Sequence, residues 1–152
     1  MDKMINIIAS SCVINNNKIL MVQENKSDIQ GLWDLPGGKV KINEDIKQAA
    51  IRETLEETGY NIDLNNILLI QNYITNRGVL LIIYFYATLS DFRQVDYRKS
   101  EISNVKWFTL EEIKNMSKKN IRGGDGIDKL LYNIENQIKY PLDILDIHNY
   151  IN

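Results

Sequence analysis

The chain has 152 residues, with 18 Lys and Arg against 20 Asp and Glu, and a formal net charge of −2. This length fits one domain, so we expect a single domain over residues 1–152. The near-neutral charge argues against binding of nucleic acid or a membrane surface by bulk charge. The single cysteine, Cys12, excludes an internal disulfide and a paired-cysteine zinc site.

The sequence carries no sign of a membrane-spanning or exported protein. Its apolar runs are shorter than the roughly 20 residues that cross a bilayer. The start, Met1–Ile5, makes a poor signal peptide because the short apolar stretch ends at Asn15–Asn17 without a cleavage-like site. We therefore expect a cytoplasmic protein.

Segments rich in Ile, Val, Leu and Tyr predict the strands, because β-branched and aromatic residues favour extended backbone. The predicted strands are residues 4–14, 18–24, 67–75, 79–89 and a shorter one at 105–108. Asn15–Asn17 and Asn76–Gly78 predict the turns of two hairpins. Both alternating sets of side chains in residues 79–89 are apolar, which predicts a central strand covered on each side.

Helical patterns occur at three places in the chain. They cover residues 44–58, a segment from Thr109 towards Met116, and residues 126–139. Asn43 and Gly59 are the expected N-cap and C-terminal stop of the first helix, and Asp125 is the expected cap of the last. Thr109–Glu112 has the pattern of a capping box. Interspersed strands and helices predict an α/β domain with a mixed sheet.

The first helix concentrates negative charge on one side. At about 100° per residue, Glu53, Glu56 and Glu57 share a wedge roughly 100° wide. The opposite side, which we expect to pack inward, carries Ile51, Leu55 and Thr58. Acids one turn apart repel by roughly 0.2–0.5 kcal/mol per pair. A divalent cation such as Mg²⁺, which takes carboxylate and phosphate oxygens as ligands, reverses that cost; a salt-bridged surface face is the alternative.

Residues around this helix add to the same picture. Arg52 lies one turn from Glu56 and is expected to orient its carboxylate. Gly37–Gly38 form a turn whose backbone can approach a ligand closely. Lys39 follows directly, and contact with phosphate or simple exposure both fit it. Trp33 suits either stacking on a base or the core.

The segment resembles the Nudix box, Gly-x5-Glu-x7-Arg-Glu-U-x-Glu-Glu-x-Gly-U, where U is usually aliphatic. The matching positions are Gly38, Glu44, Arg52, Glu53, Glu56, Glu57 and Gly59. Thr54 and Tyr60 stand at the two U positions and depart from the pattern. Both are packing positions, so the departures leave the acid set intact. The preceding stretch, Gly31–Gly38, is also similar to the family.

This resemblance implies a Nudix-type α/β/α sandwich, with a mixed sheet and the Nudix loop and helix. It also implies a MutT-like pyrophosphohydrolase that cleaves a nucleoside diphosphate linked to another moiety. Candidate substrates are a nucleoside triphosphate, oxidised or not, ADP-ribose or another nucleotide sugar. The implied partner is this small-molecule nucleotide, with no nucleic acid or membrane, and the protein is a monomer or a homodimer.

The family's metal is Mg²⁺, or Mn²⁺ in its place, and the resemblance assigns its ligands to Glu53, Glu56, Glu57 and the carbonyl of Gly37 or Gly38. Water then attacks a phosphorus and a glutamate acts as general base. Glu53 and Glu101, which lies six residues before Trp107, are the two candidates for this base. The resemblance also implies a catalytic role for Arg52. It implies that Glu44 supports the start of the helix or the surroundings of the metal, and that Trp33, Gly37 and Lys39 bind substrate.

Two other functions stay open at this point. A nucleotide-sensing module that has lost turnover would keep the fold, although such modules usually lack a box glutamate. A related isomerase acts on an isoprenyl diphosphate with an additional catalytic cysteine. Cys12, near the start of the chain, is poorly placed for that role.

Overall fold

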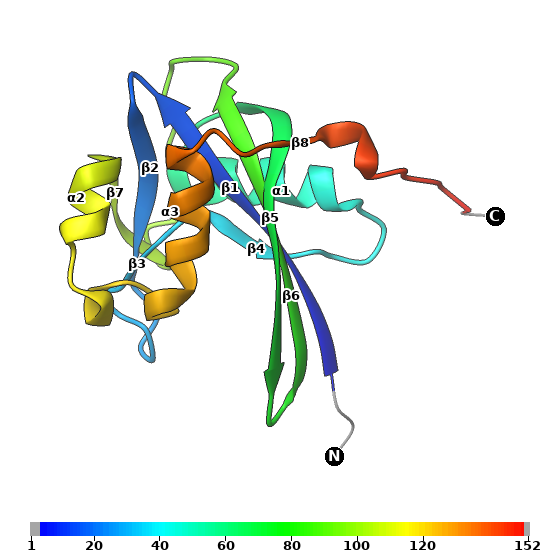
Figure 1. The fold of residues 1–152 in the computed structure, drawn as a ribbon, viewed down its shortest axis with the longest axis horizontal. Coiled ribbons are helices and arrows are strands. Elements are labelled where there is room, and N and C mark those ends of the chain that lie inside the picture. The colour runs from blue at the N-terminus through cyan, green and yellow to red at the C-terminus, as the bar shows by residue number, and fades with distance from the viewer. Residues whose placement is uncertain (1–3, 151–152) are drawn as a thin grey trace.

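The structure, a computed structural model, describes residues 4–150; the predicted N-terminal start at residues 1–3 lies outside this part. Within these residues, eight strands and three α-helices follow one another (Figure 1). The strands are β1 (Met4–Asn15), β2 (Lys18–Glu24), β3 (Trp33–Asp34), β4 (Gly37–Lys39), β5 (Ile62–Thr75), β6 (Gly78–Leu89), β7 (Ile102–Thr109) and β8 (Tyr140–Pro141). The helices are α1 (Ile46–Thr58), α2 (Leu110–Asn115) and α3 (Asp128–Glu135).

The sheet is mixed, as predicted. Its strand order is β3-β2-β1-β6-β5-β8, and β4 and β7 pair with β1 and β2 off this path. β1 and β6 run parallel, whereas the other pairs are antiparallel. β1 pairs with β2 only at the hairpin end, Ile14 with Ile19 and Asn15 with Lys18. Its middle pairs instead with β4, so Gly37 and Gly38, predicted as a turn, form part of a short strand against β1; we call these two residues the glycine segment.

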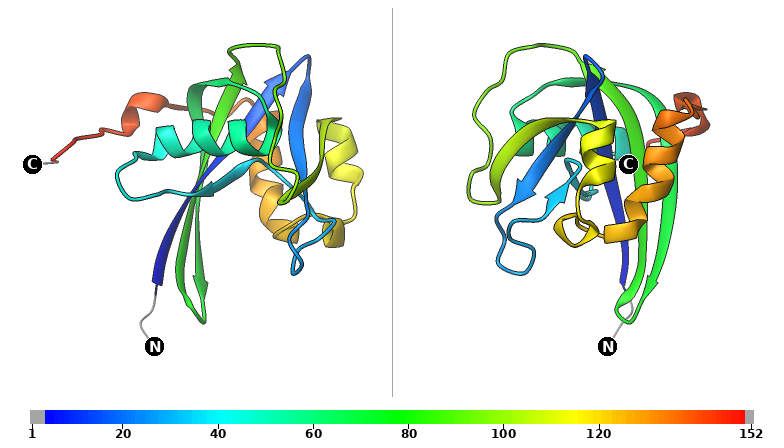
Figure 2. Two further views of the ribbon diagram at one scale, coloured as in Figure 1. Left: turned by 180° about the vertical axis from the view of Figure 1, so that it is seen from behind. Right: turned by 60° about the vertical axis from the view of Figure 1, so that its left-hand side comes forward.

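Helices cover both faces of the sheet, α1 on one and α2 with α3 on the other (Figure 2). Ile83 and Phe85 of β6 belong to the apolar cluster that contains Ala49 and Ala50 of α1. Tyr84 and Tyr86 pack against the opposite cluster, which contains residues of α2 and α3. The prediction of a central strand covered on both sides is therefore confirmed, as is the α/β/α sandwich. Cys12 is fully buried in the second of these clusters.

The strand predictions fail mainly in length. β5 begins at Ile62, earlier than residue 67, because irregular pairing at Leu64/Asn66 and Ile67/Leu69 hides the alternation of side chains. β7 begins at Ile102, earlier than residue 105. β3, β4 and β8 have two or three residues each and are too short to show any periodicity.

The cap predicted for the first helix is wrong. α1 starts after Asp45, whose side chain accepts from the Gln48 N–H while the Gln48 side chain accepts from the Asp45 N–H. Asn43 has a left-handed φ of 68° and lies outside the helix. The stop at Gly59, with φ 76°, and the capping box of Thr109 and Glu112 at the start of α2 are confirmed.

The last helix is shorter than the predicted span of residues 126–139. Gly124–Ile127 forms a 3₁₀ turn, so α3 begins after Ile127 and Asp125 is not its cap. The helix ends before Asn136, and Gln137 has a left-handed φ of 54° that no helix continues through. Among residues 4–150, no helix is long and apolar enough to cross a membrane.

Candidate active site

The acid-bearing face of α1 is turned towards the sheet. Glu53 is 9% exposed and Glu57 5% exposed. The expectation that Ile51 packs inward is wrong, because its exposed fraction is 37%. The small side chains of Ala49 and Ala50, fully buried in the cluster with β6, let this face of the helix approach the sheet closely. The next turn of the same face then places the two glutamates inside the protein.

The glycine segment, Gly37–Gly38, contacts both buried glutamates. The Gly37 N–H donates to Glu57 Oε2 at 3.2 Å. A Cβ added to Gly38 would collide with the Glu53 carboxylate, and one added to Gly37 would lie 2.6 Å from the Ala9 carbonyl oxygen. Only glycine allows the backbone to approach the carboxylates and β1 this closely.

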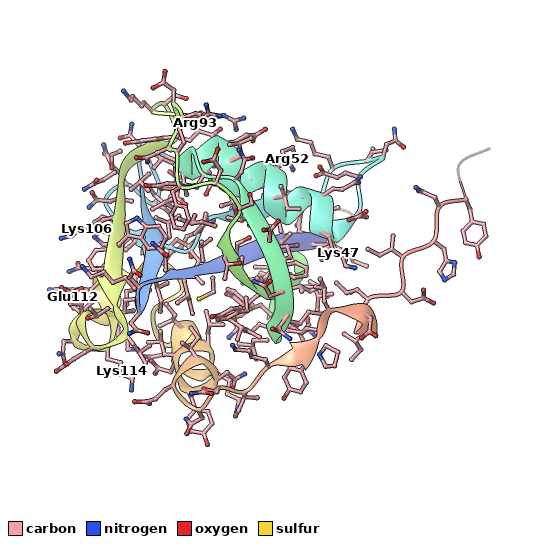
Figure 3. The ribbon with its side chains drawn as sticks, turned by 90° about the horizontal axis from the view of Figure 1, so that it is seen from above. Lys47, Arg52, Arg93, Lys106, Glu112 and Lys114 are labelled. Atoms are coloured by element: carbon pink, nitrogen blue, oxygen red, sulfur yellow. The ribbon has the colours of Figure 1, made fainter. Side chains whose placement is uncertain are left out.

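Arg52 connects the acids of the helix to the loop before it. Its Nε and Nη2 donate to the two oxygens of Glu44 at 2.9 and 2.6 Å. Its Nη1 lies 2.6 Å from Glu53 Oε1 and 3.3 Å from Glu56 Oε2, so the predicted contact with Glu56 is present. Hydrogen bonds from Arg52 lower the pKa of Glu44 to about 2. Figure 3 shows Arg52 on the outer side of α1.

The loop between β6 and β7 is fastened to the end of α1. Gln94 Nε2 donates to the Thr58 carbonyl at 2.9 Å, the Val95 N–H to the Gly59 carbonyl at 2.9 Å, and the Arg98 N–H to the Glu56 carbonyl at 2.8 Å. These three donors satisfy carbonyls that a helix end leaves unpaired. Arg93, labelled in Figure 3, lies on the same loop.

Glu101 reaches the acidic helix through an arginine. Arg98 Nη2 lies 2.8 Å from Glu56 Oε2, and its Nη1 lies 3.3 Å from Glu101 Oε2. Lys26 Nζ lies 3.6 Å from the same oxygen of Glu101. No local pattern in the sequence singles out Arg98, and only the fold shows that it bridges the helix and the loop.

Glu57 lies in surroundings that oppose its charge. Burial, together with the nearby carboxylates of Glu53, Glu24 and Asp34, raises the pKa of Glu57 to about 9, although the Gly37 N–H acts in the opposite direction. Glu24 ends β2 and is 4% exposed, and Asp34 ends β3. Sequence reasoning missed both, because an acid at the end of an apolar strand is normally solvated.

The chain is similar to known proteins in sequence and in fold. Residues 6–129 match the family model described as the NUDIX domain. The chain belongs to the NUDIX family. A NUDIX hydrolase from Nitrosomonas europaea shares the fold, with a TM-score of 0.84, 24% identity, and coverage of 97% of this chain and 100% of that one.

Two relatives show how the NUDIX chain compares in length. It is 33% identical over 109 residues to Nudix hydrolase 2 of Arabidopsis thaliana, and the matched residues make up 68% of this chain and 38% of that protein. It is 24% identical over 144 residues to phosphatase NudJ of Escherichia coli, which covers 94% of this chain and 92% of that protein. The chain spans 34%, 38% and 32% of the length of three curated matches, one of which is Nudix hydrolase 2.

The donor set of this NUDIX domain suits a hard divalent cation, because carboxylate and backbone oxygens are its usual ligands. Within residues 4–150, no three His, Cys, Asp or Glu side chains are gathered closely enough to hold a metal ion as they stand. Arg52 and Arg98 instead neutralise Glu53 and Glu56. Glu57 fits a cation best, because a bound positive charge favours the ionised form that burial opposes.

Trp33 and Lys39, two of the predicted substrate-binding residues, differ in burial. The Trp33 ring packs edge-on against Phe108, with centroids 4.9 Å apart, at the border of the core cluster. The Lys39 side chain is exposed, and its carbonyl accepts from Arg52 Nη2 at 3.2 Å. Binding of substrate by Trp33, Gly37 and Lys39 stays a prediction.

Proposed function

We propose that this NUDIX chain is a divalent-metal-dependent pyrophosphohydrolase that cleaves a nucleoside diphosphate linked to another moiety. The observation that carries the proposal is the buried Glu57, held by the Gly37 N–H and surrounded by further acids. Burying an ionised carboxylate near other acids is costly unless a cation neutralises it, and a strongly shifted pKa in such surroundings marks a candidate functional site. The names of the relatives, two hydrolases and a phosphatase, support the same reaction class.

Glu53, Glu56 and Glu57, with the carbonyl of Gly37 or Gly38, are the proposed metal ligands. The metal, Mg²⁺ or Mn²⁺, supplies charge neutralisation on the phosphates and a more acidic water when it is bound. Arg52 orients the carboxylates of Glu53 and Glu56, and Glu44 fixes Arg52 in turn. The Gly37 N–H holds Glu57 Oε2, so the other oxygen of Glu57 is free to bind.

The general base takes a proton from the attacking water, and two glutamates compete for this role. Glu53 Oε1 accepts from Arg52, which leaves Oε2 to receive the proton. Glu101 Oε2 is engaged by Arg98 and Lys26, which leaves Oε1. Both stay candidates, and the pH profiles of the Glu53→Gln and Glu101→Gln variants separate them, since loss of the base removes the acidic limb.

The test is hydrolysis of a nucleotide panel, covering nucleoside triphosphates, an oxidised triphosphate, ADP-ribose and a nucleotide sugar, with Mg²⁺ or Mn²⁺. Release of nucleoside monophosphate is measured by chromatography for wild type, Glu53→Gln and Glu57→Gln. Both variants are expected to lose about 10²–10⁴-fold in kcat. Glu111→Gln, an exposed acid of α2, is the matched control and keeps full activity.

Turnover that neither substitution reduces would refute the proposal. Tight nucleotide binding without hydrolysis under every metal would instead indicate a sensing module. A single domain over 1–152, a cytoplasmic location and the monomeric or homodimeric state stay predictions.

A further inference from the structure

Arg98, on the loop between β6 and β7, directly contacts one of the proposed metal ligands. Its Nη2 lies 2.8 Å from Glu56 Oε2, and its backbone N–H donates to the Glu56 carbonyl at 2.8 Å. Arg52 Nη1 lies 3.3 Å from the same carboxylate oxygen. Two guanidinium groups therefore share one oxygen of Glu56, and the contact made by Arg98 is the shorter of the two.

The two arginines differ in how firmly they are held. Arg52 donates to both oxygens of Glu44 at 2.9 and 2.6 Å, and its side chain is 22% exposed. The second acid that Arg98 contacts is Glu101, through a single distance of 3.3 Å, and its side chain is 40% exposed. A bidentate pair fixes the position of a guanidinium, whereas single contacts at the surface exchange with water at little cost. Arg98 is therefore the arginine that can leave Glu56.

Arg98 occupies Glu56 in a way that opposes a second positive charge there. The carboxylate carries one negative charge, and the guanidinium neutralises it at hydrogen-bond distance. Two positive charges about 4 Å apart repel each other, so a divalent cation and Arg98 compete for this carboxylate. The guanidinium keeps a partner when it leaves, because Glu101 Oε2 is already 3.3 Å away. The backbone bond to the Glu56 carbonyl does not involve the guanidinium, so only the side chain needs to turn.

We infer that Arg98 competes with the divalent cation for Glu56. It pairs with this carboxylate when the metal is absent and turns to Glu101 alone when the metal binds. The inference rests on the proposed function, which assigns Glu56 to the metal. A side chain that only orients Glu56 as a ligand would strengthen metal binding, whereas a competitor weakens it. The two roles therefore predict opposite changes in metal affinity when Arg98 is replaced.

The experiment titrates the protein with Mn²⁺ without nucleotide and follows the free ion by electron paramagnetic resonance. Arg98→Gln and Arg98→Ala are each expected to lower the Kd for Mn²⁺ by about two- to fivefold relative to wild type, the effect of removing one partly exposed ion pair. Arg93→Gln is the matched control. It removes the same charge from the same loop, where Arg93 is paired with Asp91 and its side chain is 76% exposed, and it keeps the wild-type Kd.

A second comparison shows whether the effect passes through Glu56. In a Glu56→Gln background, Arg98→Gln is expected to leave the Kd nearly unchanged, because the contested charge is gone. An equal gain in that background would mean a general effect of charge and would overturn the inference. A Kd that is unchanged or raised in both single Arg98 variants would overturn it too, even if the enzyme hydrolyses nucleotides. Absence of Mn²⁺ binding in wild type and every variant would instead refute the proposed metal dependence, and the inference with it.

Discussion

Replacing Glu57 by glutamine is expected to stabilise the metal-free protein at neutral pH. Its carboxyl has a pKa of about 9 in the folded chain and 4.5 as its ordinary value. Between these values the folded state binds a proton that the unfolded state has lost, so the free energy of unfolding falls as the pH rises through this window. The free energy of unfolding falls by about 1.4 kcal/mol for each pH unit above the ordinary pKa of 4.5, which amounts to about 3 kcal/mol at pH 7.

Glutamine avoids this cost and keeps an oxygen that accepts from the Gly37 N–H. Urea denaturation in EDTA should therefore show Glu57→Gln up to about 3 kcal/mol more stable than wild type at pH 7, with almost no difference at pH 4. Asp146→Asn, at an acid whose side chain is 84% exposed, is expected to change the free energy of unfolding by less than about 0.5 kcal/mol at either pH. An equal gain at pH 4 and pH 7 would mean that packing, and not the buried charge, is responsible. A loss of stability at pH 7 would refute the reasoning altogether.

Three further predictions follow from the same region. Binding of Mg²⁺ or Mn²⁺ near pH 7 should release up to one proton from Glu57, so the heat measured by calorimetry should change with the protonation enthalpy of the buffer. Glu57→Gln should remove this dependence on the buffer, and equal heats in all buffers for wild type would contradict the prediction. Gly38→Ala should lower kcat at least about tenfold and the free energy of unfolding by about 1–3 kcal/mol, because the added Cβ displaces the Glu53 carboxylate. Gly31→Ala is the control, because its Cβ meets nothing within 4 Å and adds only the cost of a left-handed φ. Asp45→Ala should lower the free energy of unfolding by about 1 kcal/mol, measured by thermal or urea denaturation, because it removes the cap of α1. Asn43→Gly should leave stability nearly unchanged, and a larger loss in Asn43→Gly than in Asp45→Ala would show that Asn43 is the cap.

Local patterns in the sequence predicted those parts of the fold that local patterns determine. The central strand was recognisable because both of its faces are apolar, and the capping box at Thr109 because its two partners are three residues apart. Asn43 and Asp45 are both good caps, however, and only the placement of Gln48 three residues after Asp45 decides between them. β3 and β4 exist because they pair with β2 and β1, which no pattern of two or three residues reveals.

The candidate site divides in the same way. The acids of α1, Arg52 and the glycine segment belong to one continuous motif in the sequence, so their proximity could be predicted. The electrostatic effect of Glu24 and Asp34 on Glu57 could not, because it depends on strand register and on contacts such as the one between Arg122 and Glu24, 98 residues apart in the chain. The orientation of α1 was also missed, since Ile51 outranks alanine in hydrophobicity, yet close packing against the sheet favoured Ala49 and Ala50.

The fastening of the β6–β7 loop to the end of α1 divides that loop into two parts with different tolerance to change. Its bonds to the Thr58, Gly59 and Glu56 carbonyls all fall between Gln94 and Arg98. Residues inserted before Gln94 would lengthen an exposed bend without shifting the helix. A deletion after it would pull on the last turn of α1 and on Glu101 together. Variation in the length of this loop is therefore expected to be confined to its upstream half.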